Sequence, residues 1–447
     1  MNEKNLLQEM CKYTVQSALN KGASAVRITA IREVSNEFTV LNDSLEKIQS
    51  ATDSVIQIHL FADGRYGTCT TNKKDSAGID RLLDHTLTSV RLLAKDPFRK
   101  LVPAKVRYEG SPIQIAFQGP LKTETKKELL FSCTNAVLGK NPALINVSAT
   151  LADRRRWIHI EDSSGLDCTS DETWYSIFAE CSVKGSDHTR PSDWDVIGGI
   201  TPAALGLEDC STPHSSLVGE CAVKALKRAL DKRNPQKISS GRYLVLVENR
   251  AASTLLAPII QALSGASLQQ KNSFLLNQLG QRIASPVLTL TDDPHRKELP
   301  GCRFFDNEGL ATKKRTVIDA GILNTFYLDT YYAGKMKMPC TVSSPSVLTL
   351  TGTEDNLLSL AGQMNNGLVV TGFNGGNCNP VTGDFSYGIE GFYVENGQFS
   401  FPVNEMVMTG NMTELWNHLI MAGNDALTTS SWLTPSLLFE HVELAGL

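Results

Sequence analysis

The residues best suited to contact a ligand form one turn-rich segment, Gly375-Gly376-Asn377-Cys378-Asn379-Pro380-Val381-Thr382-Gly383-Asp384-Phe385. Glycine, asparagine and proline at this density predict a backbone that turns sharply and presents amide groups and small polar side chains. At the entrance to a strand such a segment suits contact with a peptide or an anion. Gly375, Gly376, Asn377 and Asn379 are therefore candidate substrate-binding residues. The alternative interpretation is a purely structural connection between two strands.

Cys378 lies within this segment and could act as a nucleophile. A nucleophilic thiol needs a nearby base, usually a histidine, to remove its proton. No histidine lies near Cys378 in the sequence. The pattern favours a bystander thiol, and a Cys378-dependent peptidase remains the alternative.

The eight histidines do not form a recognisable metal motif. A hydrolytic zinc site usually pairs two histidines about one helical turn apart, with a glutamate as the base. No two histidines here are that close in the sequence. Glu440, His441 and Glu443 cluster in the sequence, but the alternation of a strand predicts that they split between opposite faces. A phosphate-binding glycine loop, GxSxG and SxxK are also absent, so we expect no metal site and no self-sufficient conventional hydrolase.

Two short basic runs, Arg154-Arg155-Arg156-Trp157 and Lys313-Lys314-Arg315, could contact nucleic acid. The whole chain, however, carries 43 basic and 47 acidic residues and a formal charge of −4. This balance lacks the positive footprint of a nucleic-acid-binding protein. We therefore interpret both runs as solvated strand ends and expect no direct nucleic-acid partner.

The composition is that of an ordinary globular protein. The chain has 447 residues, of which 41% are hydrophobic, and this length predicts two or three domains. The first residues lack the apolar stretch of an export signal, and no apolar run is long enough to span a membrane. The 10 cysteines form no CxxC pair. Together these features favour reduced thiols, a cytoplasmic location and no membrane association.

The elements that must position these residues divide into two parts. Hydrophobic periodicity predicts helices at about 3–20, 76–94 and 122–139, with strands between and after them. Asp63-Gly64 predicts a tight hairpin turn between two of these strands. Residues 1–200 are expected to form an N-terminal α+β domain, a curved antiparallel sheet with helices on one side. The stretch Gly185–Cys210 is rich in glycine, proline and serine and contains the expected boundary.

Residues 201–447 are expected to form a second, β-rich domain. Thr212-Pro213 predicts the start of a helix that continues to about residue 232. An apolar strand at Tyr243–Glu248 and a helix at Ser253–Leu263 follow, and short strands with tight turns then dominate. The predicted fold class is α+β with two domains, the second a mostly antiparallel, barrel-like sheet carrying helices.

Six strings taken together resemble one protein family. They are Phe61-Ala62-Asp63-Gly64-Arg65-Tyr66-Gly67, Leu328-Asp329-Thr330-Tyr331, Asn379-Pro380-Val381-Thr382-Gly383-Asp384-Phe385, Val394-Glu395-Asn396-Gly397, Pro402-Val403 and Ala422-Gly423-Asn424-Asp425. In order and spacing they resemble the TldD/PmbA family, also labelled "modulator of DNA gyrase", and within it the PmbA (TldE) branch. The resemblance implies a two-domain α+β fold and a zinc-dependent metallopeptidase system for proteolysis and peptide maturation. In that system a TldD subunit pairs with a PmbA-type subunit.

The TldD branch carries an HExxxH zinc motif on a helix that follows a strand. The matching segment here is Leu255-Leu256-Ala257-Pro258-Ile259-Ile260-Gln261-Ala262. Ala257 and Ala262 stand in place of the histidines, and Pro258 stands in place of the glutamate base. These side chains cannot coordinate zinc. Because proline disrupts helix interiors, we expect the helix to begin at Ala257 with Pro258 in its first turn.

The resemblance implies a non-catalytic partner of a TldD-like subunit, with which it forms a heteromer that acts on peptide substrates. Zinc is then expected in the partner and not in this chain, and the chain alone is expected to form a homodimer. Two alternatives remain. One is an independent peptidase that uses Cys378 or an unrecognised site, and the other is a regulatory protein that acts on DNA gyrase.

Overall fold

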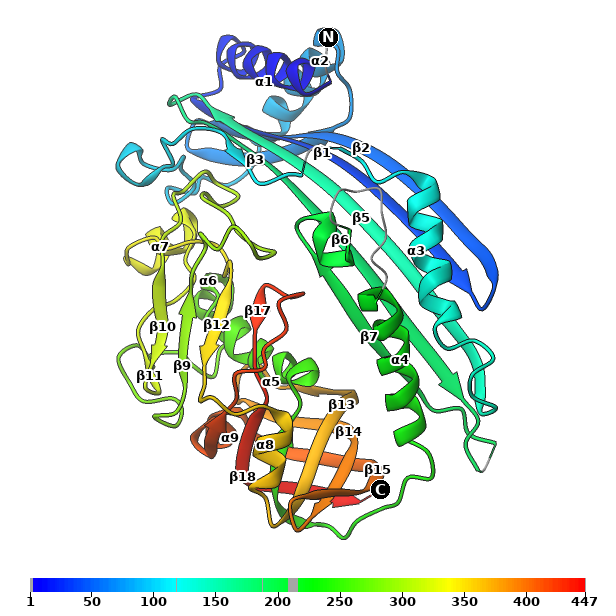
Figure 1. Cartoon of the computed structure of the whole chain (residues 1–447). Coiled ribbons are helices and arrows are strands. Elements are labelled where there is room, and N and C mark those ends of the chain that lie inside the picture. Colours follow the sequence, from blue (N-terminus) through cyan, green and yellow to red (C-terminus); the bar gives the residue numbers. More distant parts are fainter. Residues whose placement is uncertain (1–2, 118, 187, 208–215, 447) are drawn as a thin grey trace.

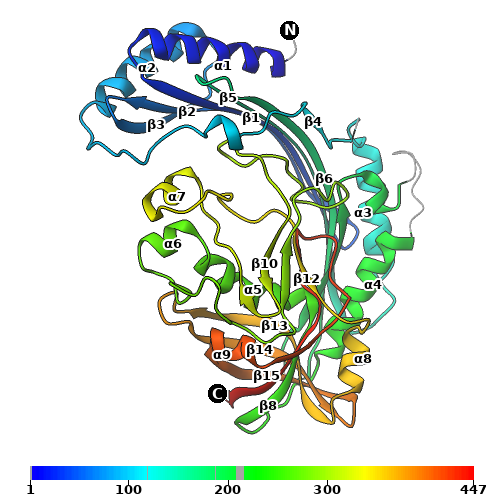
Figure 2. The same cartoon turned by 90° about the vertical axis from the view of Figure 1, so that its left-hand side faces the viewer.

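The computed structural model describes residues 3–117, 119–186, 188–207 and 216–446. Figures 1 and 2 show a long curved sheet with helices on its convex face and the C-terminal half of the chain beneath its concave face. This is the α+β architecture with largely antiparallel sheets that the sequence predicts. Thr212 and Pro213, the predicted helix start, lie outside the described residues.

The first sheet has seven strands in the order β3-β2-β1-β5-β6-β4, with β7 paired to β6. Its strands are β1 (Ala25–Leu41), β2 (Ser44–Ala62), β3 (Arg65–Thr71), β4 (Ile113–Gln114), β5 (Leu144–Asp162), β6 (Asp167–Val183) and β7 (Ser192–Gly199). Strand β1 continues without interruption from Ala25 to Leu41. Its polar middle keeps the strand pairing on both sides, where Glu33 lies opposite Asp53 of β2 and Arg156 of β5.

The hairpin turn predicted at Asp63-Gly64 is confirmed. It joins β2 to β3, and both residues have positive φ values, 54° for Asp63 and 73° for Gly64. Two consecutive positive φ angles match the twist of the flanking strands, which is why aspartate and glycine are favoured there.

Helices cover the convex face of this sheet. They are α1 (Glu3–Asn20), α2 (Ser76–Val90), α3 (Thr123–Asn135) and α4 (Ser216–Asp231), and single 3₁₀ turns lie at Ala104–Val106 and Pro202–Leu205. Leu7 of α1 and Leu83 of α2 pack into one apolar core with Ile28 and Ile58, all of them fully buried. This burial is the main force that holds the helices on the sheet.

Helix α4 lies in the expected second domain by sequence, but it packs on the first sheet. Val218, Ala222 and Ala225 are fully buried in one core with Leu151 of β5 and Ile177 of β6. We therefore propose that the two parts divide between the end of α4 and the start of the next strand, and not at residues 200–201.

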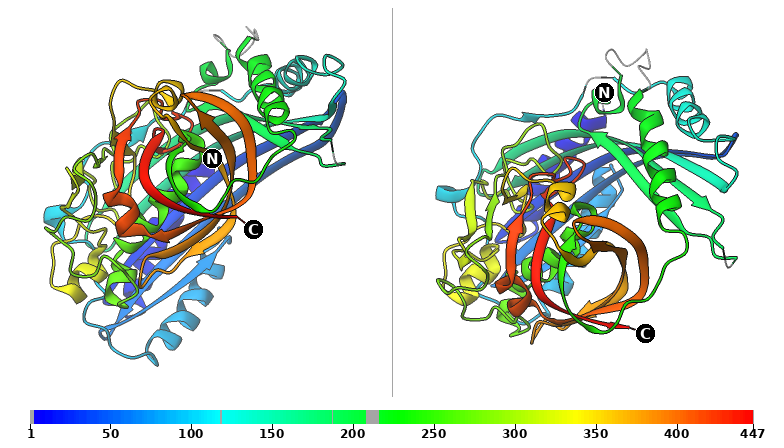
Figure 3. Two further views of the ribbon diagram at one scale, coloured as in Figure 1. Left: turned by 90° about the horizontal axis from the view of Figure 1, so that it is seen from below. Right: turned by 60° about the horizontal axis from the view of Figure 1, so that its bottom comes forward.

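The second part contains a closed five-stranded barrel. Strands β15, β14, β13, β8 and β18 pair in that order, and β15 also pairs with β18. Their bounds are β8 (Gly241–Val247), β13 (Asn366–Cys378), β14 (Asp384–Glu395), β15 (Gln398–Asn411) and β18 (Leu437–Gly446), with β16 (Leu419–Ala422) attached to β18. Figure 3 shows these strands curving around the barrel. The closed pairing leaves no exposed barrel edge at these positions.

A second, five-stranded sheet lies between the barrel and the large curved sheet (Figure 1). It contains β9 (Thr289–Asp292), β10 (Arg315–Asp319), β11 (Ile322–Leu323), β12 (Leu348–Thr351) and β17 (Trp432–Leu433). The helices of this half are α5 (Asn249–Ala262), α6 (Gly265–Gln269), α7 (Thr330–Met336), α8 (Leu357–Gly362) and α9 (Met412–Asn417). Among the described residues, no helix is long and apolar enough to cross a membrane.

The prediction that a helix begins at Ala257 is wrong. Helix α5 begins at Asn249, directly after β8, and Pro258 lies inside it. The tertiary environment overrides the proline penalty, because Leu255, Leu256 and Ile259 on the same helix are buried in the core. The free energy gained by burying several apolar side chains outweighs the cost of an interior proline, which is about 3 kcal/mol.

Candidate functional site

A pocket of about 650 Å³ lies against helix α5. Three segments far apart in the sequence form it: α5 itself, the end of β13 with the facing part of β14, and residues 430–432. The lining residues are Ser253, Thr254, Ala257, Pro258, Gln261, Cys378, Tyr387, Ser430, Ser431 and Trp432. The structure therefore brings Ala257 and Pro258, two of the positions predicted to match the zinc motif, together with Cys378.

The helix directs the predicted motif positions Ala257, Pro258 and Ala262 to different surroundings. Ala257 and Pro258 face the pocket, but Ala262 does not line it and is 1% exposed in the core. Five residues of α-helix rotate the side-chain direction by about 140° from the first position. In this chain Ala257 and Ala262 thus lie on different faces of α5.

The two titratable side chains of the pocket are Cys378 and Tyr387. Burial, with a smaller effect of Asp384, raises the pKa of the Cys378 thiol. Burial and the neighbouring Cys378 raise the pKa of Tyr387 to about 12. Both groups are therefore protonated at neutral pH, which favours the bystander interpretation of Cys378 because the thiolate is the nucleophile.

The side chains of the pocket do not fit a zinc ion. Zinc sites in proteins use three or four cysteine, histidine or carboxylate ligands. The lining offers one thiol and otherwise hydroxyl, amide, aromatic and apolar groups. No group of three or more such ligands that could hold a metal occurs anywhere in the described parts of the chain.

The glycines of the turn-rich segment lie beside the pocket, not in its lining. Gly375 and Gly376 belong to an irregular stretch of β13 and have positive φ values of 89° and 110°. A Cβ atom on Gly376 would lie 2.1 Å from the carbonyl oxygen of Ser386, whereas one on Gly375 would meet open space. The conformation and the close approach of β14 thus explain the glycine at 376 on structural grounds.

The asparagines of this segment are both exposed, and they differ in their contacts. The Asn379 carboxamide oxygen accepts a hydrogen bond from the Val381 amide at 2.9 Å, which stabilises the turn between β13 and β14. Asn377 pairs with Ser386 across the two strands. Neither asparagine lines the pocket, so a substrate role for Gly375, Gly376, Asn377 and Asn379 remains a prediction.

A buried charge network holds the start of α5 against the first sheet. Arg250 donates to Asp193 of β7 at 2.8 Å and to Glu248 at 3.0 Å. Lys232, just after α4, contacts Asp193 at 2.9 Å and Glu390 of β14 at 2.6 Å. Although burial raises the pKa of Asp193, Arg250 and Lys232 hold it below its usual range. The network therefore fixes the helix that forms the pocket wall.

A second cavity, of about 800 Å³, lies between the concave face of the first sheet and the C-terminal half. Ser431 lines both this cavity and the pocket beside α5. The prediction that Arg154–Trp157 lies at a solvated strand end is wrong in its position, although Arg154 is exposed. These residues lie in the middle of β5, where Arg154 and Arg156 face the cavity and Trp157 is buried on the opposite face.

The prediction that Glu440 and His441 point to opposite faces of a strand is wrong. A register shift between Phe439 and Val442, with a positive φ of 57° at His441, interrupts the alternation of β18. Glu440, His441 and Glu443 therefore line one shallow pocket with His418, whose ring lies 5.5 Å from that of His441. A bulge of this kind re-aims side chains in a way that strict alternation does not anticipate.

Sequence reasoning missed most of the polar wall of the α5 pocket. Ser430, Ser431 and Trp432 come from a segment without any motif. Ser253 and Thr254 belong to the predicted helix at Ser253–Leu263, but no motif marked them as site residues. The one available signal was the concentration of serine and threonine at 428–431. Its proximity to α5 depends on the fold.

Comparison with known proteins gives consistent results. Residues 240–446 match the family model described as PmbA/TldA metallopeptidase C-terminal domain. The chain is 25% identical over 448 residues to the metalloprotease PmbA homolog of Haemophilus influenzae, covering 98% of this chain and 96% of that protein.

Two solved structures share the whole architecture. A proposed modulator of DNA gyrase from Bacteroides thetaiotaomicron superimposes with a TM-score of 0.93 at 37% identity, with 100% of both chains covered. TldE from Thermococcus kodakarensis superimposes with a TM-score of 0.81 at 18% identity, covering 99% of this chain and 100% of that one. At that identity the second comparison concerns the fold alone.

Proposed function

The chain belongs to the PmbA/TldD family of metallopeptidase-like proteins, and on that premise we propose that it is a non-catalytic partner of a TldD-type subunit. In this proposal the two chains form a heteromer that processes peptides, and the TldD-type chain contributes the zinc ion. The present chain contributes a wall of the peptide-binding space and no metal ligand.

The observation that supports the proposal most is the pocket face of α5. Ala257 and Pro258 occupy the two motif positions that face the pocket, and no histidine or carboxylate lines it. Hydrolysis by this pocket alone would lack both a metal ligand set and a general base. A polar pocket without catalytic groups is instead suited to hold a peptide.

The proposal places this activity in the cytoplasm. None of the nine described cysteines forms a disulfide, and six of them are buried. Reduced, buried thiols of this kind are typical of proteins in a reducing compartment.

The test measures zinc content and peptidase activity in the same preparations. The purified chain, the purified TldD-type subunit and their mixture are each incubated with zinc, separated by gel filtration and assayed on an unstructured peptide. We expect substoichiometric zinc in the chain alone, no hydrolysis by it, and a joint peak with hydrolysis in the mixture. Alone, we expect the chain to elute as a homodimer.

The variant Cys378→Ala separates the proposal from the independent-peptidase alternative. The mixture that contains Cys378→Ala should hydrolyse the peptide as fast as the mixture with the unchanged chain. Tightly bound zinc in the chain alone, or hydrolysis by it that disappears in Cys378→Ala, would contradict the proposal.

A further inference from the structure

Arginine side chains gather in the cavity beneath the curved sheet, where they outnumber the acidic residues Glu172, Asp306, Glu308 and Asp329. Five arginines line it: Arg27, Arg99, Arg154, Arg156 and Arg303. Arg27 is buried, Arg99, Arg156 and Arg303 are partly exposed, and Arg154 is exposed within the cavity, so an unpaired charge is most costly at Arg27.

Two of the arginines have partners within the protein. Arg27 contacts Glu308 at 3.1 Å, and Arg99 stacks on Tyr331, with its guanidinium carbon 3.5 Å from the ring centre. The Nε atom of Arg27, a residue that is 6% exposed, nevertheless has no hydrogen-bond partner. The Nε atom of Arg27 is thus a buried hydrogen-bond donor that no acceptor uses, although Arg27 is paired with Glu308.

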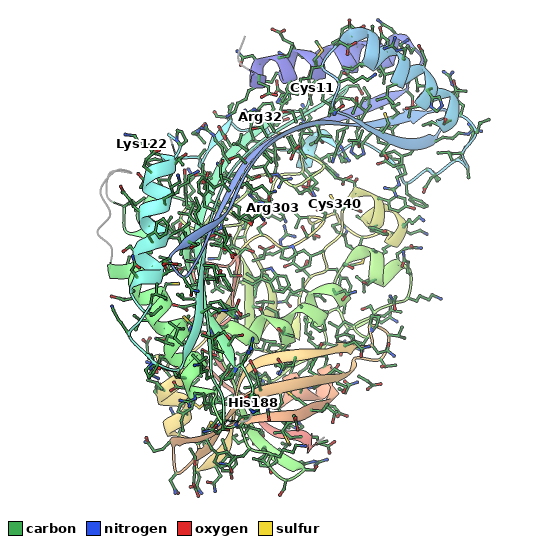
Figure 4. The ribbon with its side chains drawn as sticks, turned by 90° about the vertical axis from the view of Figure 1, so that its right-hand side faces the viewer. Cys11, Arg32, Lys122, His188, Arg303 and Cys340 are labelled. Carbon is green, nitrogen blue, oxygen red and sulfur yellow. The ribbon has the colours of Figure 1, made fainter. Side chains whose placement is uncertain are left out.

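The other three arginines form no ion pair closer than 3.8 Å among the described residues, although Arg154 and Arg156 interact electrostatically with Glu172. Arg154 makes no hydrogen bond or ion pair within the described structure. Arg156 approaches Glu33 only to 3.8 Å, and its buried Nε atom donates to no acceptor. Arg303 donates to Pro345 at 2.9 Å and to Ser346 at 2.7 Å but forms no ion pair. Figure 4 shows Arg303 between the curved sheet and the C-terminal half.

The acidic residues of the same cavity offset these charges only in part, because burial raises the pKa of Glu172, Asp306 and Asp329. Asp306 accepts the Leu310 amide at 3.0 Å, and Asp329 caps α7 through the Tyr332 amide at 2.7 Å. Glu172 lies opposite Arg156 in the β5–β6 pairing, and burial raises its pKa although Arg156 and Arg154 act to lower it. Burial disfavours the ionised form of such a carboxyl group, so the group compensates the positive charge of the arginines poorly.

Arg154 and Arg156 are two residues apart on β5 and point to the same face of the sheet, so their guanidinium groups can converge on one ligand. We propose that Arg154 and Arg156 form a subsite for a carboxylate of a bound peptide, at the end of a path that begins in the α5 pocket and passes Ser431. The inference rests on the proposed function, because it assumes that the α5 pocket holds a peptide. The volume of about 800 Å³ is within the range of ligand-binding cavities.

Fluorescence anisotropy with labelled unstructured peptides tests the subsite on the full-length chain. One peptide carries glutamates in its C-terminal half, a second carries glutamines instead, and each is made with a free and an amidated C-terminus. We expect a Kd about tenfold lower for the glutamate peptide than for the glutamine peptide, or for the free than for the amidated C-terminus. Added salt should reduce this difference in Kd. The amidated peptides show which of the two carboxylates is bound.

The double variant Arg154→Gln/Arg156→Gln should remove the tenfold advantage, while Arg154→Lys/Arg156→Lys should retain part of it through charge alone. Arg81→Gln is the matched control, since Arg81 is exposed on α2 at the opposite face of the sheet. Unchanged thermal unfolding midpoints verify that the variants are folded.

The outcomes separate the two proposals. Equal binding of all peptides, unaffected by the double variant, overturns the carboxylate subsite but leaves peptide binding intact. Binding of none of the peptides, alone or with a TldD-type subunit, overturns both. A labelled single-stranded oligonucleotide that binds more tightly than the acidic peptides, and loses affinity in the double variant, would assign the arginines to nucleic acid and overturn the inference.

Discussion

The guanidinium of Arg250 donates a hydrogen bond to the carboxylate of Asp193 at 2.8 Å, and the two side chains are 4% and 3% exposed. Arg250 lies in the first turn of α5 and Asp193 lies in β7, so this contact joins the pocket helix to the first sheet. The Arg250 guanidinium also lies 4.9 Å from the ring centre of Trp194. The position of the pocket therefore depends on a contact between the two halves of the chain.

Substitution of Arg250 by methionine should strongly destabilise the protein. The change leaves Asp193 and Glu248 buried with fewer partners, which typically costs about 3–5 kcal/mol. Urea denaturation measures the change in the free energy of unfolding. Arg242→Met is the control, because its ion pair with Glu443 is exposed and should contribute at most about 1 kcal/mol. Equal losses in the two variants would contradict the prediction.

Ala257→His and Ala262→His should differ although both restore a motif residue. Ala257 is exposed to the pocket and has room for a larger side chain, whereas Ala262 is 1% exposed. An imidazole at 262 should overpack the core and reduce the free energy of unfolding by about 1–3 kcal/mol. Thermal unfolding of the two single variants provides the comparison. A stable Ala262→His variant would show that α5 can rotate or shift.

Pro258→Ala should stabilise the protein. Pro258 lies inside α5 and cannot donate to the carbonyl one turn earlier, and alanine restores that hydrogen bond. The expected gain in the free energy of unfolding is about 1–3 kcal/mol. Chemical denaturation at neutral pH tests this. A loss of stability would indicate that the proline ring makes packing contacts worth more than the missing hydrogen bond.

Acidification should destabilise the fold in part through His59. Burial, with a contribution from Arg27, lowers the pKa of His59 from 6.5 to about 4. Between these values the unfolded chain binds a proton that the folded chain does not, so stability is present above pH 6.5 and falls as the pH drops toward 4. The loss from this one group is at most about 3 kcal/mol.

Unfolding free energies at several pH values between 7 and 4 measure this dependence. His59→Gln should flatten the profile in this window, and His85→Gln, at an exposed position of α2, should leave it unchanged. An unaltered profile in His59→Gln would exclude His59 as the cause.

Local patterns predicted the larger elements well. The helix at residues 3–20, the turn at Asp63-Gly64 and the strand near Tyr243–Glu248 depend on neighbours within a few positions, and the structure contains all three. The same local reasoning failed at Pro258 and His441. At Pro258, core packing outweighs the cost of a proline inside a helix. At His441, a bulge interrupts the alternation of the strand. Distant segments set both the packing and the bulge.

The chemical identity of the residues at the altered zinc motif was determined by the sequence alone. No fold can make a metal ligand of Ala257 or a carboxylate base of Pro258. Tertiary structure alone decided that Ala257 faces a pocket while Ala262 is buried, and that Cys378 and Ser431 lie beside it. It also turned Arg154 and Arg156 toward the cavity between the curved sheet and the C-terminal half. Side-chain chemistry belongs to each residue, whereas burial and proximity arise from packing between segments more than a hundred residues apart.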